Sequence, residues 1–221
     1  AEWWGKIRDW QEDASEREVL QFETPTLLGA QAIRAIWEGT DGKALIVSDV
    51  GQHQMLEAQY YEHEEPYTLL TSGGLGTMGF SLPAAIGASF HEKDREVWII
   101  VGDGSIQMNI QELATARQYD TPVKIAILNN QFLGMVRQWQ ELFYEKRYAS
   151  TVMDIAPDFV ELAKAYGAVG LRATKKSEVE DVIKEALAVD NTVLMDFKIS
   201  REEGVFPMVP AGKSTTEMLL V

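Results

Sequence analysis

The sequence of 221 residues contains no cysteine. This absence excludes disulfide bonds, thiolate metal sites and a cysteine nucleophile, and it fits a reducing compartment, so we expect a cytoplasmic protein. Basic residues are also scarce, with 20 Lys and Arg against 34 Asp and Glu, and the net charge is −14. Such a charge repels nucleic acids and anionic membrane surfaces, so neither is an expected partner.

Long apolar runs are missing as well. No stretch reaches the roughly 20 residues that span a bilayer, and the charged amino terminus does not fit a secretory signal. The sequence begins without Met, inside a helical pattern of Trp3, Ile7 and Trp10, which favours a fragment boundary. We predict a leading helical segment over 1–22, one domain over 23–200 and a C-terminal tail over 201–221.

Short apolar segments alternate with helical patterns through the predicted domain. Strands are expected at 44–50, 67–72, 96–103, 123–130, 168–173 and 192–199. A helix with Thr24 as its N-cap is expected to run to Gly39, and further helices are expected at 78–91, 109–119, 134–146, 157–166 and 177–189. Uniformly apolar strands separated by helices predict a three-layer α/β/α fold. Its six-stranded sheet should be mostly parallel and bind ligands beyond the carboxyl ends of the strands.

Polar and glycine residues follow two of these strands. Residues 102–105 read Gly-Asp-Gly-Ser, where glycines allow a ligand to approach closely and a hydroxyl with free backbone N–H groups can bind phosphate. Asn129–Asn130 end the next strand, with Asn130 lying 27 residues after Asp103. Adjacent parallel strands would place Asp103 and Asn130 side by side, and carboxylate, amide and carbonyl oxygens suit Mg²⁺. Either motif alone is more often an ordinary turn.

The pair of motifs at this spacing resembles the signature of thiamine-diphosphate enzymes. That resemblance implies that the side chains of Asp103 and Asn130 and the carbonyl of Phe132 bind the metal, while the diphosphate of the cofactor completes its coordination. It also implies that the diphosphate is bound by residues around the first motif, namely Gly102, Gly104 and Ser105.

Two earlier segments extend the resemblance. Residues 48–61, which contain Gly-Gln-His-Gln-Met, look like the acetolactate synthase segment whose Gln52 and His53 reach the diphosphate. The glycine-rich residues 69–90 look like the loop under the aminopyrimidine ring. This implies that Gly76 contacts the ring and that the side chain of Met78 holds the cofactor in its bent conformation. Without the resemblance, His53 is more often a surface or helix-start histidine, the glycines a flexible turn and a methionine part of a core.

Residues 131–151 are the most family-specific segment. Gly-Met-Val-Arg-Gln-Trp-Gln resembles the acetolactate synthase (acetohydroxyacid synthase) catalytic subunit. This implies that Gly134 and Met135 contact the cofactor and that Trp139 projects into the pocket of the second substrate, so Met78, Met135 and Trp139 are the expected catalytic residues. A purely physical alternative is a packed apolar helix face that includes Val136, Trp139 and Phe143. The tail 201–221 resembles the family's closing tail and is expected to cap the site.

The resemblance also implies an activity and partners. A family member decarboxylates pyruvate and joins the remainder to a second 2-ketoacid, pyruvate or 2-ketobutyrate, in branched-chain amino acid biosynthesis. No segment resembles the pyrimidine-binding domain, and FAD contacts are expected mainly outside this chain. We therefore expect an incomplete site that is inactive alone, in a homo-oligomer with a possible regulatory subunit. The alternatives are a pyruvate oxidase or another carboligase-type thiamine-diphosphate enzyme, or an isolated, non-catalytic cofactor-binding module.

Overall fold

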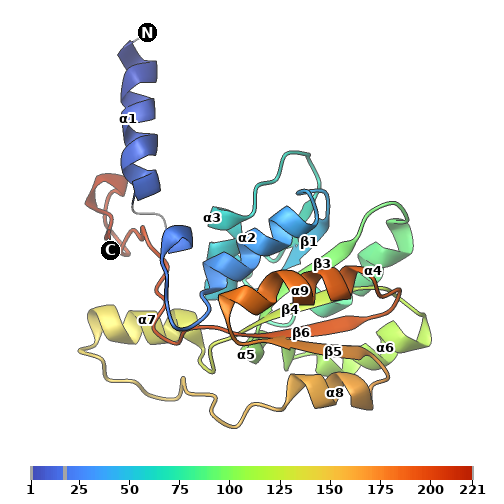
Figure 1. The fold of residues 1–221 in the computed structure, drawn as a ribbon. Coiled ribbons are helices and arrows are strands. Elements are labelled where there is room, and N and C mark those ends of the chain that lie inside the picture. The colour runs from blue at the N-terminus through green and yellow to red at the C-terminus, as the bar shows by residue number, and fades with distance from the viewer. Residues whose placement is uncertain (1, 17–18, 221) are drawn as a thin grey trace.

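The computed structural model describes residues 2–16 and 19–220. Its centre is one sheet in which every neighbouring pair of strands runs parallel (Figure 1). The predicted six-stranded sheet is confirmed, and each strand lies within its predicted range. The strand order is β2 (Leu69–Thr71), β1 (Leu45–Ser48), β3 (Val97–Gly102), β4 (Lys124–Asn129), β6 (Val193–Lys198) and β5 (Val169–Ala173).

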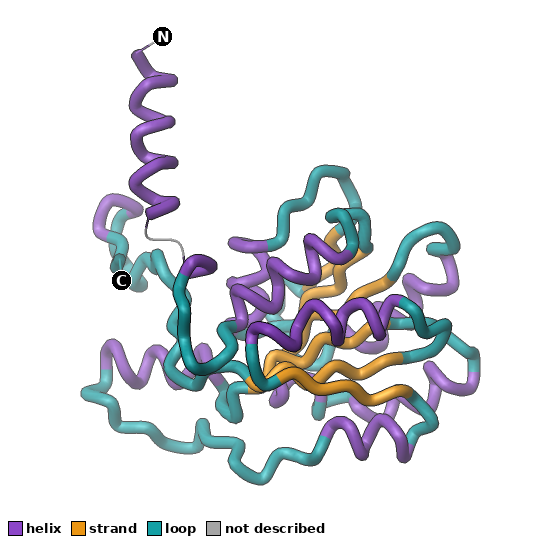
Figure 2. Tube along the Cα trace, in the orientation of Figure 1, coloured by secondary structure: helices purple, strands orange, loops and turns teal. Residues whose placement is uncertain are grey.

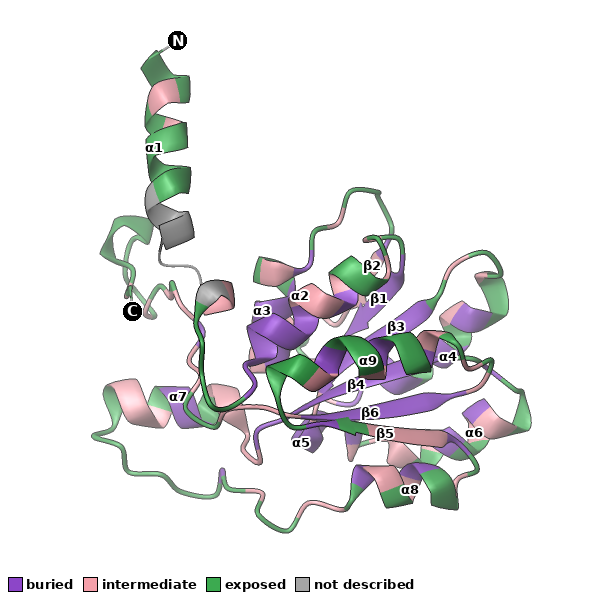
Figure 3. Ribbon diagram, viewed as in Figure 1, coloured by how far each residue is buried: buried purple, intermediate pink, exposed green. Residues whose placement is uncertain are grey.

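Helices cover both faces of the sheet, so the predicted three-layer architecture is also confirmed. On one face, α2 (Gly29–Gly39), α3 (Gln52–Tyr60) and α9 (Lys176–Leu187) pack over a core that contains Trp98 and Phe197. On the other face, α4 (Ser81–His91), α6 (Leu113–Gln118) and α8 (Phe159–Ala165) form a second core around Phe159. Strands β1, β3 and β4 lie buried between these layers (Figure 3).

The remaining helices lie outside these two layers or at the sheet edge. The four-residue α5 (Asp103–Ile106) and α7 (Gly134–Phe143) follow β3 and β4, and short 3-10 turns span Val19–Gln21, Ile110–Glu112 and Thr215–Glu217. Helix α1 (Glu2–Glu16) extends away from the sheet and its helices (Figure 2). Among the described residues, no helix is both long and apolar enough to cross a membrane. The predicted division into leading segment, domain and tail stays a prediction.

Helix α2 begins later than predicted. It starts at Gly29 rather than at Thr24, because Leu27 is still extended and forms a parallel bridge with Ile199. The carboxylate of Glu203 accepts hydrogen bonds from the first two backbone N–H groups of the helix, at 2.5 and 3.1 Å. A residue from the far end of the chain therefore supplies the cap that the sequence pattern assigned locally.

Helix α3 was not among the predicted helices. Its buried face contains His53 and Glu57 beside Leu56, so the apolar periodicity that marks a helix is absent there. Glu57 is compensated by His63, whose Nε2 lies 2.6 Å from Glu57 Oε1. Buried polar partners thus conceal this helix from a hydrophobic pattern.

Candidate cofactor-binding site

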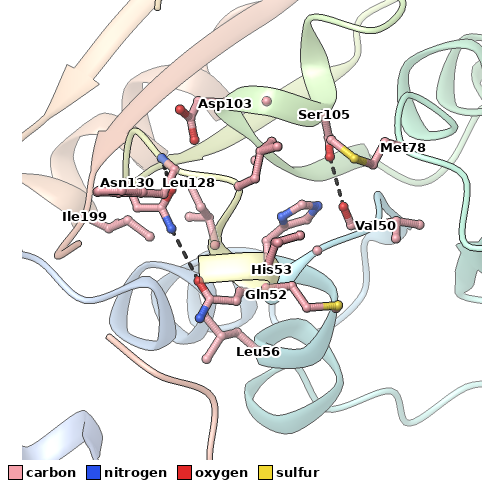
Figure 4. Close-up of a pocket in the computed structure, with 18 of the residues that line it drawn as sticks. Val50, Gln52, His53, Leu56, Met78, Asp103, Ser105, Leu128, Asn130 and Ile199 are labelled. Carbon is pink, nitrogen blue, oxygen red and sulfur yellow. Dashed lines mark hydrogen bonds between the residues drawn. The ribbon is translucent and has the colours of Figure 1, made fainter. Parts of the chain in front are cut away.

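The carboxyl ends of β1, β3 and β4 border a cavity of about 180 Å³ (Figure 4). In the sheet β1 and β3 are neighbours, with β2 beyond β1 and β4 beyond β3. The cavity therefore lies where the strand order reverses, which is the expected ligand-binding position in an open parallel sheet. All the residues predicted to bind the cofactor line it, although their binding role stays a prediction. They are Gln52, His53, Gly76, Met78, Gly102, Asp103, Gly104, Ser105, Asn130, Phe132, Gly134 and Met135.

Asp103 presents an uncompensated oxygen at this cavity. Gly102 pairs with Leu128 in the sheet, so Asp103 emerges at the same edge as Asn130. The side chain is buried, and its Oδ2 has no hydrogen-bond partner among the described residues. Burial raises the pKa of Asp103 to about 7, against the opposing effects of backbone N–H groups and of Lys198. A cation bound beside Oδ2 would compensate this carboxylate.

Asn130 is held on both sides of its amide. Its Oδ1 accepts a hydrogen bond from the N–H of Phe132 at 2.9 Å, and its Nδ2 donates to Gln52 Oε1 at 3.4 Å. Among the described residues, no three His, Asp or Glu side chains converge on a possible metal site. A cation here would depend on a mixed set of carboxylate, amide and carbonyl oxygens, which is the set that Mg²⁺ accepts. The residues present therefore fit the predicted metal.

His53 is buried at the cavity, so its interpretation as a surface histidine is wrong. Burial lowers the pKa of His53 to about 4, although the negative charge of Asp49 opposes the shift. The ring is therefore neutral at pH 7, and its Nε2 has no partner within the described chain. A Cβ on Gly102 would lie 2.9 Å from His53 Nδ1, so the glycine makes room for the ring. With the proton on Nε2, the ring can donate to an anionic ligand.

Asp49 organises the glycine-rich loop on the other side of the cavity. Its buried carboxylate accepts hydrogen bonds from the N–H groups of Val50, Gly79 and Ser81 at 2.8, 2.9 and 2.8 Å. These bonds fix the loop that contains Gly76 against the start of α4. Asp49 is not among the predicted site residues, although it follows a buried strand just as Asp103 does.

Replacing Asp49 with asparagine is expected to lower the free energy of unfolding by about 2 to 4 kcal/mol, because an amide offers one acceptor oxygen and turns its NH₂ toward a backbone donor. Urea denaturation measures this loss. Asp41→Asn is the matched control, since the Asp41 side chain is exposed. Equal unfolding free energies for the two variants would contradict the assigned role.

Ser105 forms a hydrogen bond with its side chain, whereas Gly104 is needed for close packing. Ser105 Oγ donates to the carbonyl of Val50 at 2.9 Å, so its proton is already engaged (Figure 4). A Cβ on Gly104 would lie 2.8 Å from Leu133 Cδ2, which makes the glycine necessary for this packing. A phosphate contact by Ser105 would therefore use an oxygen lone pair or the backbone.

Helix α7 has its polar side inward. Arg137 and Gln138 are buried, whereas Val136, Trp139 and Phe143 are 49%, 52% and 47% exposed. The packed-core interpretation of this apolar face is therefore wrong. Of the three predicted catalytic residues, Met78 and Met135 line the cavity, and Trp139 does not.

Over its described residues, 201–220, the C-terminal tail contributes Glu203 to the cavity lining. Arg137 donates from Nη2 to both carboxylate oxygens of Glu202, at 2.9 and 2.8 Å, which fastens the tail to α7. Farther on, Met208 and Leu219 pair with each other in an antiparallel bridge. No local sequence pattern reveals Glu203 or Gln138, because their hydrogen-bond partners are remote in the chain. The predicted capping of the site by the whole tail stays a prediction.

Comparisons with known proteins agree with this geometry. Residues 49–197 match the family described as thiamine pyrophosphate enzyme, C-terminal TPP binding domain, where TPP is thiamine diphosphate. An acetolactate synthase large subunit from Haemophilus influenzae is 43% identical over 99% of the chain, and an acetolactate synthase from Mycobacterium leprae is 48% identical over 87%. The chain spans 38% and 32% of the lengths of these relatives.

A solved structure supports the same assignment. The thiamine diphosphate-dependent 4-hydroxybenzoylformate decarboxylase of Rhodococcus jostii RHA1 superposes with a TM-score of 0.77 and 28% identity, over 85% of this chain and 35% of its own. The family match covers β3, β4 and the twelve residues predicted to bind the cofactor, which lie between Gln52 and Met135. The chain therefore belongs to the thiamine pyrophosphate enzymes, as their C-terminal TPP-binding domain.

Proposed function

We propose that this chain is the diphosphate- and metal-binding part of an acetolactate synthase. The observation that carries the proposal is the convergence of two uncompensated buried atoms, Asp103 Oδ2 and His53 Nε2, on the cavity lined by the predicted cofactor residues. One of these atoms suits a cation and the other an anion, and magnesium-bound diphosphate offers both. The resemblance to acetolactate synthases in residues 131–151 favours that enzyme over other members of the family.

In this proposal each group of residues has a distinct task. Asp103, Asn130 and the carbonyl of Phe132 hold Mg²⁺, and neutral His53 donates to the diphosphate with Gln52, Gly102, Gly104 and Ser105 around it. The apolar side chains of Met78 and Met135, which line the cavity, exclude water from the cofactor. Thiamine diphosphate, when bound, supplies the chemistry that decarboxylates pyruvate. The two-carbon unit that remains after loss of carbon dioxide is joined to pyruvate or 2-ketobutyrate, in branched-chain amino acid biosynthesis.

The proposed partner is a pyrimidine-binding domain that completes the site. Exposed apolar side chains at and beside the cavity support a covering surface: Leu75 is 94% exposed beside Gly76, Val136 lines the cavity and is 49% exposed, and Trp139 is exposed on α7. Trp139 would reach the second substrate only when that surface is in place. A homo-oligomer, a regulatory subunit, FAD bound mainly outside this chain and a cytoplasmic location complete the proposal.

The test is acetolactate formation from pyruvate, measured with Mg²⁺ and thiamine diphosphate, for the chain alone and mixed with the remaining domains of an acetolactate synthase. We expect product only from the mixture, and none when the mixture contains the Asp103→Asn variant. Aldehyde and carbon dioxide without acetolactate would instead favour a decarboxylase like the similar solved structure. Cofactor binding without any turnover would favour the non-catalytic module.

A further inference from the structure

Gln138 connects the C-terminal tail to the cavity. Its side chain is buried on α7, where Oε1 accepts from the N–H of Val205 at 3.0 Å and Nε2 donates to the carbonyl of Val205 at 2.9 Å. A backbone cannot exchange its N–H with its carbonyl. The two bonds to Val205 therefore fix which end of the Gln138 amide is the acceptor.

This fixed direction passes to the next amide. Gln52 Nε2 donates to the same Gln138 Oε1 at 2.7 Å, so Gln52 turns its own oxygen away from Gln138. That oxygen then accepts the 3.4 Å contact from Asn130 Nδ2. Asn130 is left with Oδ1 on its other side, where it accepts from Phe132 and retains a lone pair for a cation. Three side-chain amides thus run from the tail to a proposed metal ligand.

The absence of a side chain at Gly134 makes room for the contact between Gln52 and Asn130. A Cβ on Gly134 would overlap Gln52 Oε1 and lie 2.8 Å from Asn130 Nδ2. The two amides therefore meet directly over Gly134, and any larger residue would displace them. A glycine at the first position of α7 is required by this contact rather than by backbone conformation.

We propose that Gln138 is a positioning residue, which uses the backbone of Val205 to orient Gln52 and, through it, Asn130, so that Asn130 presents its oxygen to the cation. This inference rests on the proposed function, because it needs a cation at Asn130. The adjacent bonds between Arg137 and Glu202 hold the tail in the position from which Val205 acts.

The test measures the affinity of the chain for Mg²⁺ at saturating thiamine diphosphate by titration calorimetry, with the side-chain NH₂ signals of Gln52 and Asn130 followed by NMR in the unliganded chain. Gln138→Met removes the closer of the two acceptors of Gln52 Nε2, the other being the carbonyl of Glu203 at 3.3 Å, and is expected to weaken Mg²⁺ binding about 10- to 100-fold, the range typical of residues that orient metal ligands. The NH₂ protons of Gln52 and Asn130 should lose protection from exchange in the same variant.

Two further variants separate positioning from packing. Gln138→Glu still accepts from Val205 and Gln52 but loses the donor to the Val205 carbonyl, so it should recover part of the Mg²⁺ affinity. Gly134→Ala displaces the side-chain amides of Gln52 and Asn130 while the bonds between Gln138 and Val205 remain, and it should reproduce the loss even where Gln138→Met fails to fold. Gln140→Met is the matched control, because Gln140 lies on the same helix with two bonds of its own, to Ala149 and Thr151, and should bind Mg²⁺ normally.

The outcomes distinguish the inference from the function beneath it. If the wild-type chain binds Mg²⁺ and Gln138→Met binds it equally well, the inference is overturned and the proposed function stands. The inference is also overturned if Gln138→Glu loses as much affinity as Gln138→Met while both remain folded. If the wild-type chain binds no Mg²⁺ with thiamine diphosphate, the proposed metal site and the inference fail together.

Discussion

Replacing Asp103 with asparagine is expected to abolish Mg²⁺-dependent binding of thiamine diphosphate and, at the same time, to stabilise the unliganded chain. Binding is lost because the amide removes the negative charge from the proposed metal site. Stability rises because burial has raised the pKa of Asp103 from 3.8 to about 7. The stability linked to this raised pKa is present below pH 3.8 and lost as the pH rises through 7. At pH 8 the ionised carboxylate therefore costs about 4 kcal/mol.

Calorimetric titration and thermal unfolding at pH 8 measure the two effects on the same samples. Asp120→Asn is the control, since its side chain is 85% exposed and lies outside the cavity lining. We expect the Asp103 variant to melt above the wild-type chain without ligand and to show no heat with Mg²⁺ and cofactor. A variant that binds normally, or that melts below the wild type, would show that Asp103 has a different role.

Replacing His53 with glutamine is expected to make the free energy of unfolding rise as the pH falls. The pKa of His53 falls from 6.5 in the unfolded chain to about 4 in the fold, mainly by burial. The stability linked to this shift is present above pH 6.5 and lost as the pH falls through 4, a loss of about 3 kcal/mol. The pKa shift of Asp103 changes stability with the opposite sign over nearly the same pH range. The contributions of Asp103 and His53 to the pH dependence therefore offset each other in the wild-type chain.

The two variants should therefore separate in opposite directions. Between pH 8 and pH 5, His53→Gln should gain unfolding free energy on acidification, because the raised pKa of Asp103 is no longer offset, and Asp103→Asn should lose it. Urea denaturation at the two pH values measures the difference. His91→Gln controls for an exposed histidine and should follow the wild type. The same slope for His53→Gln and the wild type would mean that His53 titrates normally in the fold.

The sheet could be predicted because its strands carry a strong local signal. Val97–Gly102 and Lys124–Asn129 are buried on both faces, so they are almost uniformly apolar and are followed by polar loops. Asp103 and Asn130 could be found for the same reason, since a polar residue after a buried strand marks the ligand-binding edge. This logic depends only on residues that are close in the sequence.

The parts that could not be predicted depend on distant partners. The start of α2 is decided by Glu203 and by the bridge from Leu27, neither of which a capping pattern contains. The sequence pattern of α7 correctly predicts an amphipathic helix, but it does not show which face is buried. The polar face is buried because Arg137 has Glu202 of the tail as a counter-charge. A hydrophobic period gives two faces, and tertiary contacts decide which of them is covered.

The outward apolar face of α7 also affects the solubility and self-association of the isolated chain. A net charge of −14 keeps copies apart through mutual repulsion, which acts over about 10 Å at 0.1 M salt and over shorter distances as salt is added. Sulfate and similar salts also strengthen apolar association. Dilute buffers therefore favour dispersed chains, and concentrated sulfate favours self-association through Val136, Trp139 and Phe143. Precipitation by salt and protection by a partner domain would then act on the same side chains.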